Sequence, residues 1–531
     1  KHPEVLVSDA LLVINHATTD DRIKVIVLDL KGMSRSGLNK LKVIGSALEQ
    51  FKAAGKKIIA IGDYYSQNQY YLASYADEIT MNPMGGILID GYSRYSLYYK
   101  EAFAKLKVTQ HIFKVGKFKS AVEPYIREDM SPEAKEANIA WLDELWTVYK
   151  TDIAARRNMS ASNFDENLDD LITKLKVVDG DFGQYALTNQ WVDSLKSREQ
   201  IRQQLIELVG DDGDDNFEQV NYSDYLSVVK PPFAFDNPML DKVAVIVAQG
   251  VIQDGHRKSG EIGGDSTAKL LRKARLDDTV KAVVLRVDSP GGSAFASEII
   301  RQEVEALKAQ GKPVIASMGS VAASGGYWIS ATANEIWASP TTITGSIGIF
   351  GMFMTFENSL KTIGISSDGV ATTEMAGISL LRPLNPKIGD VIQLNIEKGY
   401  QRFLNLVAQG RDMTPEDVDK IAQGRVWTGT MALKLGLVDK LGTLDDAIVA
   451  AADMASLKTY DIKVIEQALS AKDKFFRELF GNSDASADNS GNAQSFGVQA
   501  MMQMLDQQLS VIGQFNDPQH AYVHCQVCDI Q

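Results

Sequence analysis

The chain has 531 residues, of which 45% are hydrophobic and 23% charged, and its formal net charge is −13. This composition is typical of a folded globular protein with roughly two to four domains. The negative charge argues against a general nucleic-acid binder, because neutralising phosphates requires a basic surface. No run of about 18 apolar residues occurs, so we expect no transmembrane helix within these residues.

The N-terminus begins abruptly. The chain starts at Lys1 without a methionine, and structured sequence is already under way at Val5. We therefore expect an N-terminal segment, including the opening strand of the first half, to be missing.

Both halves of the chain follow the same order of elements. Each half has an apolar strand, a loop rich in small residues, a helix ending at glycine, a second buried strand, and then a closely matching decapeptide. These decapeptides are YYLASYADEI and YWISATANEI. The matching segments are 23–55 and 280–311, 56–63 and 312–319, and 70–79 and 327–336. Short strands alternating with helices predict an α/β fold of two tandem repeats with largely parallel sheets.

Composition marks the boundaries between the parts. An acidic stretch at 210–218 and a proline-interrupted stretch at 230–238 separate the halves. Helical patterns cover 125–175 in the first half and 385–425 in the second. We predict an N-terminal repeat at 1–210, a linker at 211–240, a C-terminal repeat at 241–483, and a polar linker with a C-terminal helix or tail at 484–531.

The two cysteines, Cys525 and Cys528, lie near the C-terminus and exclude a disulfide framework. Redox CxxC motifs usually open a helix after a strand. We therefore interpret this pair as an incidental feature of the tail. A disulfide within the pair or between subunits is the next alternative.

A nucleophile candidate lies in the second half, in ASMGSVAASGGYWIS (Ala316–Ser330). Ser324 follows two alanines and precedes Gly325 and Gly326, at the start of a predicted helix. A serine at such a turn has an exposed Oγ, and a helix N-terminus stabilises developing negative charge. The alternative is an ordinary N-cap serine.

The motif DSPGGS (288–293) follows the apolar strand VVLRV in the same half. Gly291 and Gly292 at a strand end can point backbone N–H groups into a cleft, as an oxyanion hole requires. The alternative is an ordinary βα turn.

A base candidate lies in the first half, in FKVGKFKSAVEPY (113–125). Lys114, Lys117 and Lys119 occupy an apolar stretch that resembles a strand, and at period two Lys117 and Lys119 share a face. A buried lysine has a lowered pKa and can act as a base. The alternative is a solvated strand edge. None of the six histidines lies in a motif with a serine or cysteine, which disfavours a Ser-His-Asp triad.

Comparison of the repeats favours one shared site. The position equivalent to Ser324 in the first half is about Gln67, and DSPGG is replaced there by KGMSR (31–35). The position equivalent to Lys119 in the second half is about Ala376. Each half keeps what the other lacks, so one site assembled from both repeats explains the pattern better than two separate sites.

Taken together, DSPGGS, AASGGYWIS, TGSIG (344–348) and KFKSAVEP resemble the long, duplicated bacterial form of the signal peptide peptidase A family, also called protease IV. The resemblance covers nearly the whole chain. It implies a crotonase/Clp-protease-like fold and an N-terminal anchor in the bacterial inner membrane, with the catalytic part in the periplasm. It also implies a homotetramer acting on peptide substrates, mainly cleaved signal peptides.

The resemblance assigns the base to Lys119 and the nucleophile to Ser324. The oxyanion N–H maps onto Gly291 or Gly292, and Ser346 of TGSIG is a possible supporting hydroxyl. The expected chemistry is a Ser–Lys serine protease that requires no metal or cofactor. Two alternatives are a crotonase-type acyl-CoA enzyme and an inactive scaffold, and neither explains why the residues divide between the repeats.

Overall fold

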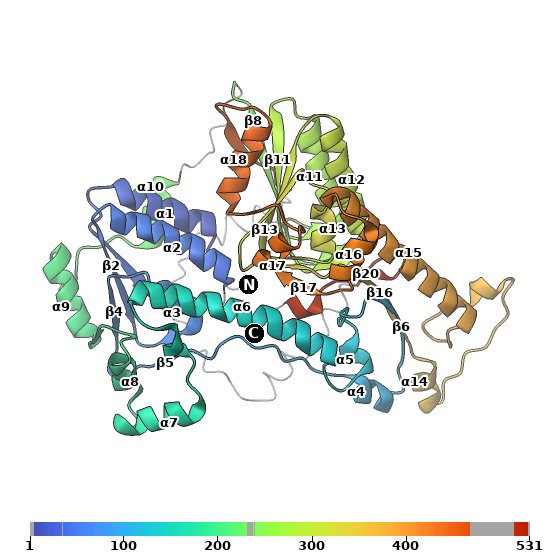
Figure 1. Ribbon diagram of the computed structural model, residues 1–531, viewed down its shortest axis with the longest axis horizontal. Coiled ribbons are helices and arrows are strands. Elements are labelled where there is room, and N and C mark those ends of the chain that lie inside the picture. The colour runs from blue at the N-terminus through green and yellow to red at the C-terminus, as the bar shows by residue number, and fades with distance from the viewer. Residues whose placement is uncertain (1–4, 34–35, 231–236, 238, 468–514, 529–531) are drawn as a thin grey trace. The chain divides into compact units, whose positions relative to one another are not determined.

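The computed structural model describes residues 5–33, 36–230, 237, 239–467 and 515–528 (Figure 1). The chain forms two compact units. The first comprises residues 1–92 and 143–235, and the second comprises 93–142 and 236–531. The predicted polar linker at 484–495 and the predicted helix at 498–512 lie outside the described residues.

The first unit is built around a four-stranded parallel sheet of order β1-β2-β4-β7. Its strands are β1 (Val25–Asp29), β2 (Lys57–Gly62), β4 (Glu78–Met81) and β7 (Ser194–Leu195), with the short pair β3 (Tyr65–Ser66) and β5 (Ile87–Leu88). Its helices are α1 (Val7–Thr19), α2 (Leu38–Ala53), α3 (Gln67–Ala73), η1 (Ala161–Phe164), α7 (Leu168–Val177), α8 (Phe182–Thr188), α9 (Arg198–Val209) and α10 (Tyr222–Val229). Helix α6 (Pro132–Arg157) begins in the second unit and ends in the first.

The second unit contains a largely parallel sheet of order β17-β15-β13-β11-β8-β19, with β14 and β18 beside it. These strands are β8 (Lys242–Gln249), β11 (Val280–Ser289), β13 (Val314–Ala323), β14 (Glu335–Ala338), β15 (Ile343–Gly345), β17 (Val426–Thr428), β18 (Lys440–Leu441) and β19 (Asp461–Val464). The strands predicted in both repeats are thus confirmed.

A second sheet of this unit has the order β10-β9-β12-β20-β16-β6 and is antiparallel from β12 to β6. Its strands are β6 (Thr109–Val115), β9 (Ile252–Gln253), β10 (Ile262–Gly263), β12 (Gly291–Ser293), β16 (Ile349–Thr355) and β20 (Ala521–His524). The helices of the unit are α4 (Lys100–Lys105), α5 (Glu123–Ile126), α11 (Gly264–Leu276), α12 (Ala294–Ala309), α13 (Gly325–Ser330), α14 (Glu357–Thr362), η2 (Glu374–Gly377), α15 (Pro386–Arg411), α16 (Pro415–Ile421), α17 (Gly429–Lys434), α18 (Leu444–Met454) and η3 (Gln526–Cys528).

Strand β11 is continuously apolar from Ala282 to Leu285, because both faces of its sheet are covered (Figure 1). Val283 and Leu285 belong to the core cluster that includes α11 and α12. Val284, between them in the sequence, points to the other face, where it packs in a cluster with α18. The continuous apolar run therefore fixes a buried strand whose carboxyl end, at Ser289, lies at one edge of the sheet.

Residues 93–142 lie within the predicted N-terminal repeat, 1–210, but they pack in the second unit. The cause is strand pairing. All seven residues of β6, from Thr109 to Val115, pair with β16 in antiparallel register. This pairing carries Lys119, which follows β6, into the same unit as the second repeat.

Candidate active site

Ser324 lies directly after β13, at the carboxyl end of the parallel sheet. Its backbone has φ 56° and ψ −109°, a conformation that is strained for a residue with a side chain. Two hydrogen bonds hold it there: the Ser324 N–H donates to the Gly345 carbonyl at 2.8 Å, and the Trp328 N–H donates to the Ser324 carbonyl at 2.8 Å. The Ser324 side chain makes no capping hydrogen bond to α13, so the N-cap interpretation does not describe this serine.

The glycines after Ser324 are required by close packing. A Cβ at Gly325 would lie 2.8 Å from the Ser297 Oγ, and a Cβ at Gly326 would lie 2.5 Å from the Ser289 carbonyl oxygen. Both distances are shorter than normal contacts of a Cβ. The small-residue pattern seen in the sequence therefore lets β11 and α12 approach the nucleophile turn.

Lys119 lies in a turn after β6, so the predicted strand through Lys117 and Lys119 is wrong. Gly116 ends the strand with φ 112°, and the Lys119 N–H donates to the Gly116 carbonyl at 3.2 Å. Lys114 and Lys117 are exposed, whereas Lys119 is 2% exposed. The period-two pattern failed because a positive-φ glycine interrupts it.

Two glycines make room for the buried lysine stem. A Cβ at Gly424, which has φ 80°, would lie 2.6 Å from the Lys119 backbone nitrogen. A Cβ at Gly348 would lie 3.2 Å from the Lys119 Cδ. Gly348 belongs to the recognised TGSIG motif, but Gly424 was missed, because nothing local in its sequence indicates contact with a residue so distant in the chain.

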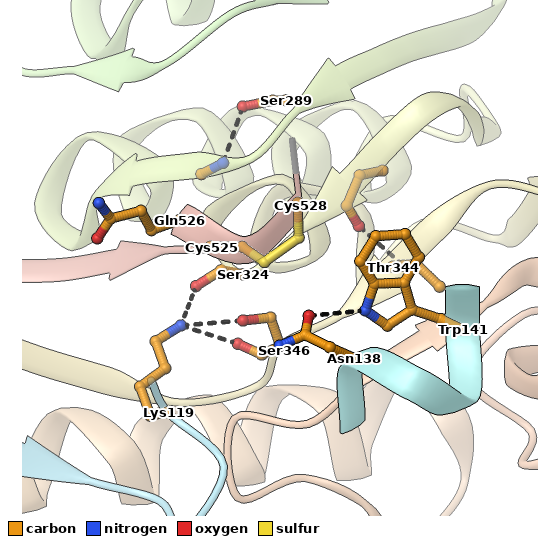
Figure 2. The surroundings of a disulfide bond; sticks show 12 residues. Lys119, Asn138, Trp141, Ser289, Ser324, Thr344, Ser346, Cys525, Gln526 and Cys528 are labelled. Atoms are coloured by element: carbon orange, nitrogen blue, oxygen red, sulfur yellow. Dashed lines mark hydrogen bonds between the residues drawn. A yellow bond between two sulfur atoms is a disulfide. The ribbon is translucent and has the colours of Figure 1, made fainter. Parts of the chain in front are cut away.

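The Lys119 amine meets the candidate nucleophile within one chain (Figure 2). Its Nζ lies 2.8 Å from the Ser324 Oγ, 3.1 Å from the Ser346 Oγ and 3.1 Å from the Ser346 carbonyl oxygen. A neutral amine has two N–H donors and one lone pair. Two donors directed at Ser346 leave the lone pair for the Ser324 hydroxyl proton, so this geometry suits a general base.

Burial lowers the pKa of Lys119 from 10.5 to about 7. The physical cause is desolvation, which disfavours the charged ammonium. A lysine with this pKa is partly neutral near pH 7 and can accept a proton.

A loop with two successive positive φ angles holds Ser346 beside Lys119. Gly345 has φ 76° and Ser346 has φ 52°, and the Ser346 N–H donates to the Arg425 carbonyl at 2.7 Å. This loop directs both the hydroxyl and the carbonyl of Ser346 toward Lys119.

The structure distinguishes the surroundings of the two candidate oxyanion glycines. A Cβ at Gly291 would lie 2.5 Å from the Gly325 nitrogen, whereas a Cβ at Gly292 would lie 1.9 Å from the Ile252 carbonyl oxygen. Gly291 is therefore beside the nucleophile turn, and Gly292 packs against β9. The Gly291 N–H donates to the Ser289 Oγ at 3.1 Å.

The C-terminal cysteines are not incidental. Cys525 and Cys528 form a disulfide in the surroundings of Ser324, Lys119 and Ser346 (Figure 2). This is the pairing that the sequence left as the second alternative. Its place beside the candidate site could not be predicted, because the strand that carries it there pairs with segments far away in the sequence.

Comparison with known proteins identifies the family. The sequence pattern of peptidase family S49 matches residues 50–211 and 306–458, one region in each repeat. The chain belongs to peptidase family S49. It is therefore a serine protease, and the double match confirms the tandem α/β repeats.

The chain is similar over nearly its whole length to bacterial relatives of this family. It is 44% identical to Protease 4 of Salmonella typhi, over 98% of this chain and 84% of that protein. It is 43% identical to Protease 4 of Haemophilus influenzae, over 98% of this chain and 85% of that protein. Serine protease SPPA of Arabidopsis thaliana chloroplasts is 29% identical over 83% of this chain and 64% of that protein.

Solved structures show weaker likeness. A ClpP1 variant from Listeria monocytogenes covers 38% of this chain and 94% of its own, at 15% identity and TM-score 0.26. A variant of the 1510-N membrane-bound stomatin-specific protease, in complex with a substrate peptide, covers 45% and 98%, at 17% identity and TM-score 0.28.

A Gly424→Ala substitution is expected to abolish most peptidase activity without altering Ser324 or Lys119, because its Cβ collides with the backbone of Lys119. Gly436→Ala is a matched control. Gly436 has φ 73°, but its Cβ would meet nothing within 4 Å. Both variants incur a similar cost of about 1 kcal/mol from the positive φ, to which Gly424→Ala adds its collision. Thermal unfolding checks that both variants are folded, and only Gly424→Ala should lose kcat. Equal activities would show that the Lys119 turn tolerates displacement.

A Lys119→Met variant is expected to be more stable than the wild type at pH 6, with an advantage that shrinks as pH rises from 7 toward 10. The pKa of Lys119 is about 7 in the folded state and 10.5 in its ordinary state. Between these two pKa values, the unfolded wild type binds one more proton than the folded wild type. Wild-type stability then increases by about 1.4 kcal/mol per pH unit. Urea unfolding at several pH values measures the effect. Lys114→Met, at an exposed lysine, is the control for removing one lysine from the surface.

Proposed function

We propose that this protease is a Ser–Lys endopeptidase in which Lys119 activates Ser324. The observation that carries this proposal is the 2.8 Å contact between the Lys119 Nζ and the Ser324 Oγ, made by a lysine that is 2% exposed. Neutral Lys119 accepts the proton of Ser324 as its Oγ attacks the scissile carbonyl. The resulting ammonium then protonates the leaving amine, and water hydrolyses the acyl-enzyme.

The negative charge of the tetrahedral intermediate needs N–H donors at the nucleophile turn. The N–H groups of this turn and of the Gly291–Gly292 strand are the candidates. Gly291 is favoured over Gly292 by its position beside Gly325. The Gly291 N–H donates to the Ser289 Oγ in this structure. An oxyanion would accept from the same N–H, either together with the Ser289 Oγ or in its place.

We further propose that the substrates are cleaved signal peptides and other apolar peptides, bound as extended strands at the membrane. Two lines of similarity support this substrate class: the motifs of the signal peptide peptidase A family, and 35% identity over 34% of the chain to a relative named putative signal peptide peptidase SppA, from Enterococcus faecium. The acyl-CoA and scaffold alternatives have no comparable support, since the chain belongs to a peptidase family.

The proposed location is the bacterial inner membrane, with an N-terminal anchor and the catalytic part in the periplasm as a homotetramer. Across the described residues, none of the helices combines the length and apolarity needed to cross a bilayer. The Cys525–Cys528 disulfide supports the periplasm, since disulfides persist in oxidising compartments.

Ser324→Ala and Lys119→Ala are each expected to lower kcat/KM for peptide hydrolysis by about 10³-fold or more, the size typical for loss of a nucleophile or its base. Lys117→Ala is the matched control. It removes a neighbouring lysine that is exposed and pairs with Glu133 at 3.8 Å, so it should retain near-wild-type activity. Activity that survives in Lys119→Ala but not in Lys117→Ala would move the base to Lys117.

Peptide hydrolysis is expected to rise with pH through the lysine pKa of about 7 and to level off above it. The sign follows from the role, since only the neutral amine accepts the serine proton. Below the pKa, kcat/KM should fall about tenfold per pH unit. A pH profile of the chemical step that is flat from pH 5 to 9 would contradict a lysine base.

A further inference from the structure

The C-terminal strand β20 fills a gap between two strands of the active-site sheet. On one side it pairs antiparallel with β12, where His524 lies opposite Gly291 and Val523 opposite Gly292. On the other side it pairs antiparallel with β16, where Tyr522 lies opposite Phe350. Val523 is fully buried, and His524 is 4% exposed. A single strand held on both edges in this way has the form of a peptide bound by strand addition.

The slot is shaped for a peptide backbone beside the nucleophile. The Val523 carbonyl oxygen would lie 2.0 Å from a Cβ at Gly291 and 3.0 Å from a Cβ at Gly325. Only glycine at these positions admits this backbone oxygen. Gly291, an oxyanion candidate in the sequence, and Gly325, which follows Ser324, therefore also allow the close approach of the strand in the slot.

The strand leaves its extended path where it reaches Ser324. The Cys525 N–H donates to the Pro290 carbonyl at 2.8 Å, and the chain then turns through η3. The Cα atoms of Cys525 and Cys528 are 5.6 Å apart, whereas three residue steps of extended chain span about 10 Å. The disulfide therefore holds a turn in place of the extended backbone that a protease substrate presents to its nucleophile.

Further contacts anchor this segment at both ends. Asp517 is 2% exposed, and its Oδ2 accepts hydrogen bonds from the Ser293 Oγ at 2.5 Å and the Phe295 N–H at 3.0 Å. Past the strand, the Arg94 Nη2 donates to the Gln526 carbonyl at 2.8 Å. The segment is thus bound through the same strand that carries the oxyanion glycines.

We propose that residues 515–528 are a resident inhibitory strand, which occupies the place of a peptide substrate and is retained by the Cys525–Cys528 disulfide. This inference rests on the proposed function of Ser324 and Lys119. The disulfide-closed turn explains why the strand can lie beside Ser324 as an inhibitor instead of being cut as a substrate.

Reduction releases the strand. A dithiol reductant transfers two electrons and two protons to the disulfide, giving two thiols on the protein and one disulfide on the reductant. Both cysteines are at most 2% exposed, so this exchange follows local opening of the segment. Opening a disulfide loop with a sequence separation of 3 adds chain entropy to the released state, which favours release by about 20-fold.

The test compares full-length protein in its oxidised form with the same protein after dithiothreitol, using hydrolysis of an apolar chromogenic peptide. We expect the reduced form to be more active, by up to about 20-fold. The double variant Cys525→Ser/Cys528→Ser should match the reduced wild type with or without dithiothreitol. Equal activity of the oxidised and reduced wild type would overturn the proposal. Failure of the proposed function looks different: Ser324→Ala would then leave hydrolysis unchanged in both redox states.

A second measurement follows the pairing of strand β20 itself, and it needs no substitution in the C-terminal segment. Hydrogen exchange of the 521–525 amides is followed in Ser324→Ala protein, so that proteolysis during the measurement cannot interfere. Protection in the oxidised form should fall when dithiothreitol is added. Protection that persists after complete reduction would make β20 a permanent strand of the sheet and would also overturn the proposal.

Discussion

The site depends on the burial of one amine. Lys119 is enclosed with its Nζ among hydroxyl and carbonyl oxygens, and this desolvation brings its pKa to about 7. Water would restore the charged form, so in the proposed mechanism every element that excludes water from this amine supports its role as a base. The turn after β6, the TGSIG loop and the approach of Gly424 are such elements. Their shared effect is to keep a lone pair directed at Ser324.

The first repeat has no buried amine to support at the position equivalent to Ser324. Gln67, at the position equivalent to Ser324, uses its side-chain oxygen to accept the Gly91 N–H at 2.8 Å and its carbonyl to accept the Tyr149 hydroxyl at 2.9 Å. Its polar atoms are thus committed to structure, and the core of this unit contains buried aromatic side chains, including Tyr149. The first unit therefore has a structural glutamine at the position where the second repeat has Ser324, while β6, which precedes Lys119, pairs with β16 of the second repeat.

The sequence predicted the features that depend on local chemistry or on repetition. The apolar strands, the glycine-rich turn at Ser324 and the complementary losses in the two repeats could all be read directly. Choosing Lys119 over Lys117 required the family resemblance, because a period-two pattern cannot register the positive φ of Gly116. The roles of Gly424 and of strand β20 could not be predicted, since both depend on contacts with residues far away in the chain. The same limitation hid the proximity of the disulfide to Ser324.

The occupied slot and the lowered pKa are physically linked. The pKa of His524, on the resident strand, is lowered to about 4. Burial of the imidazole is the larger cause, and the positive charge of the nearby Lys119 ammonium is the second. The imidazole is then neutral near pH 7, and a neutral strand over the site favours the neutral amine. By linkage, the neutral amine favours the strand to the same extent. In the proposed mechanism, a substrate side chain that covers Lys119 must therefore carry no positive charge, since a positive charge there would oppose protonation of the base as the reaction proceeds. The proposed preference for apolar peptides is thus consistent with the same desolvation that makes a lysine able to act as a base.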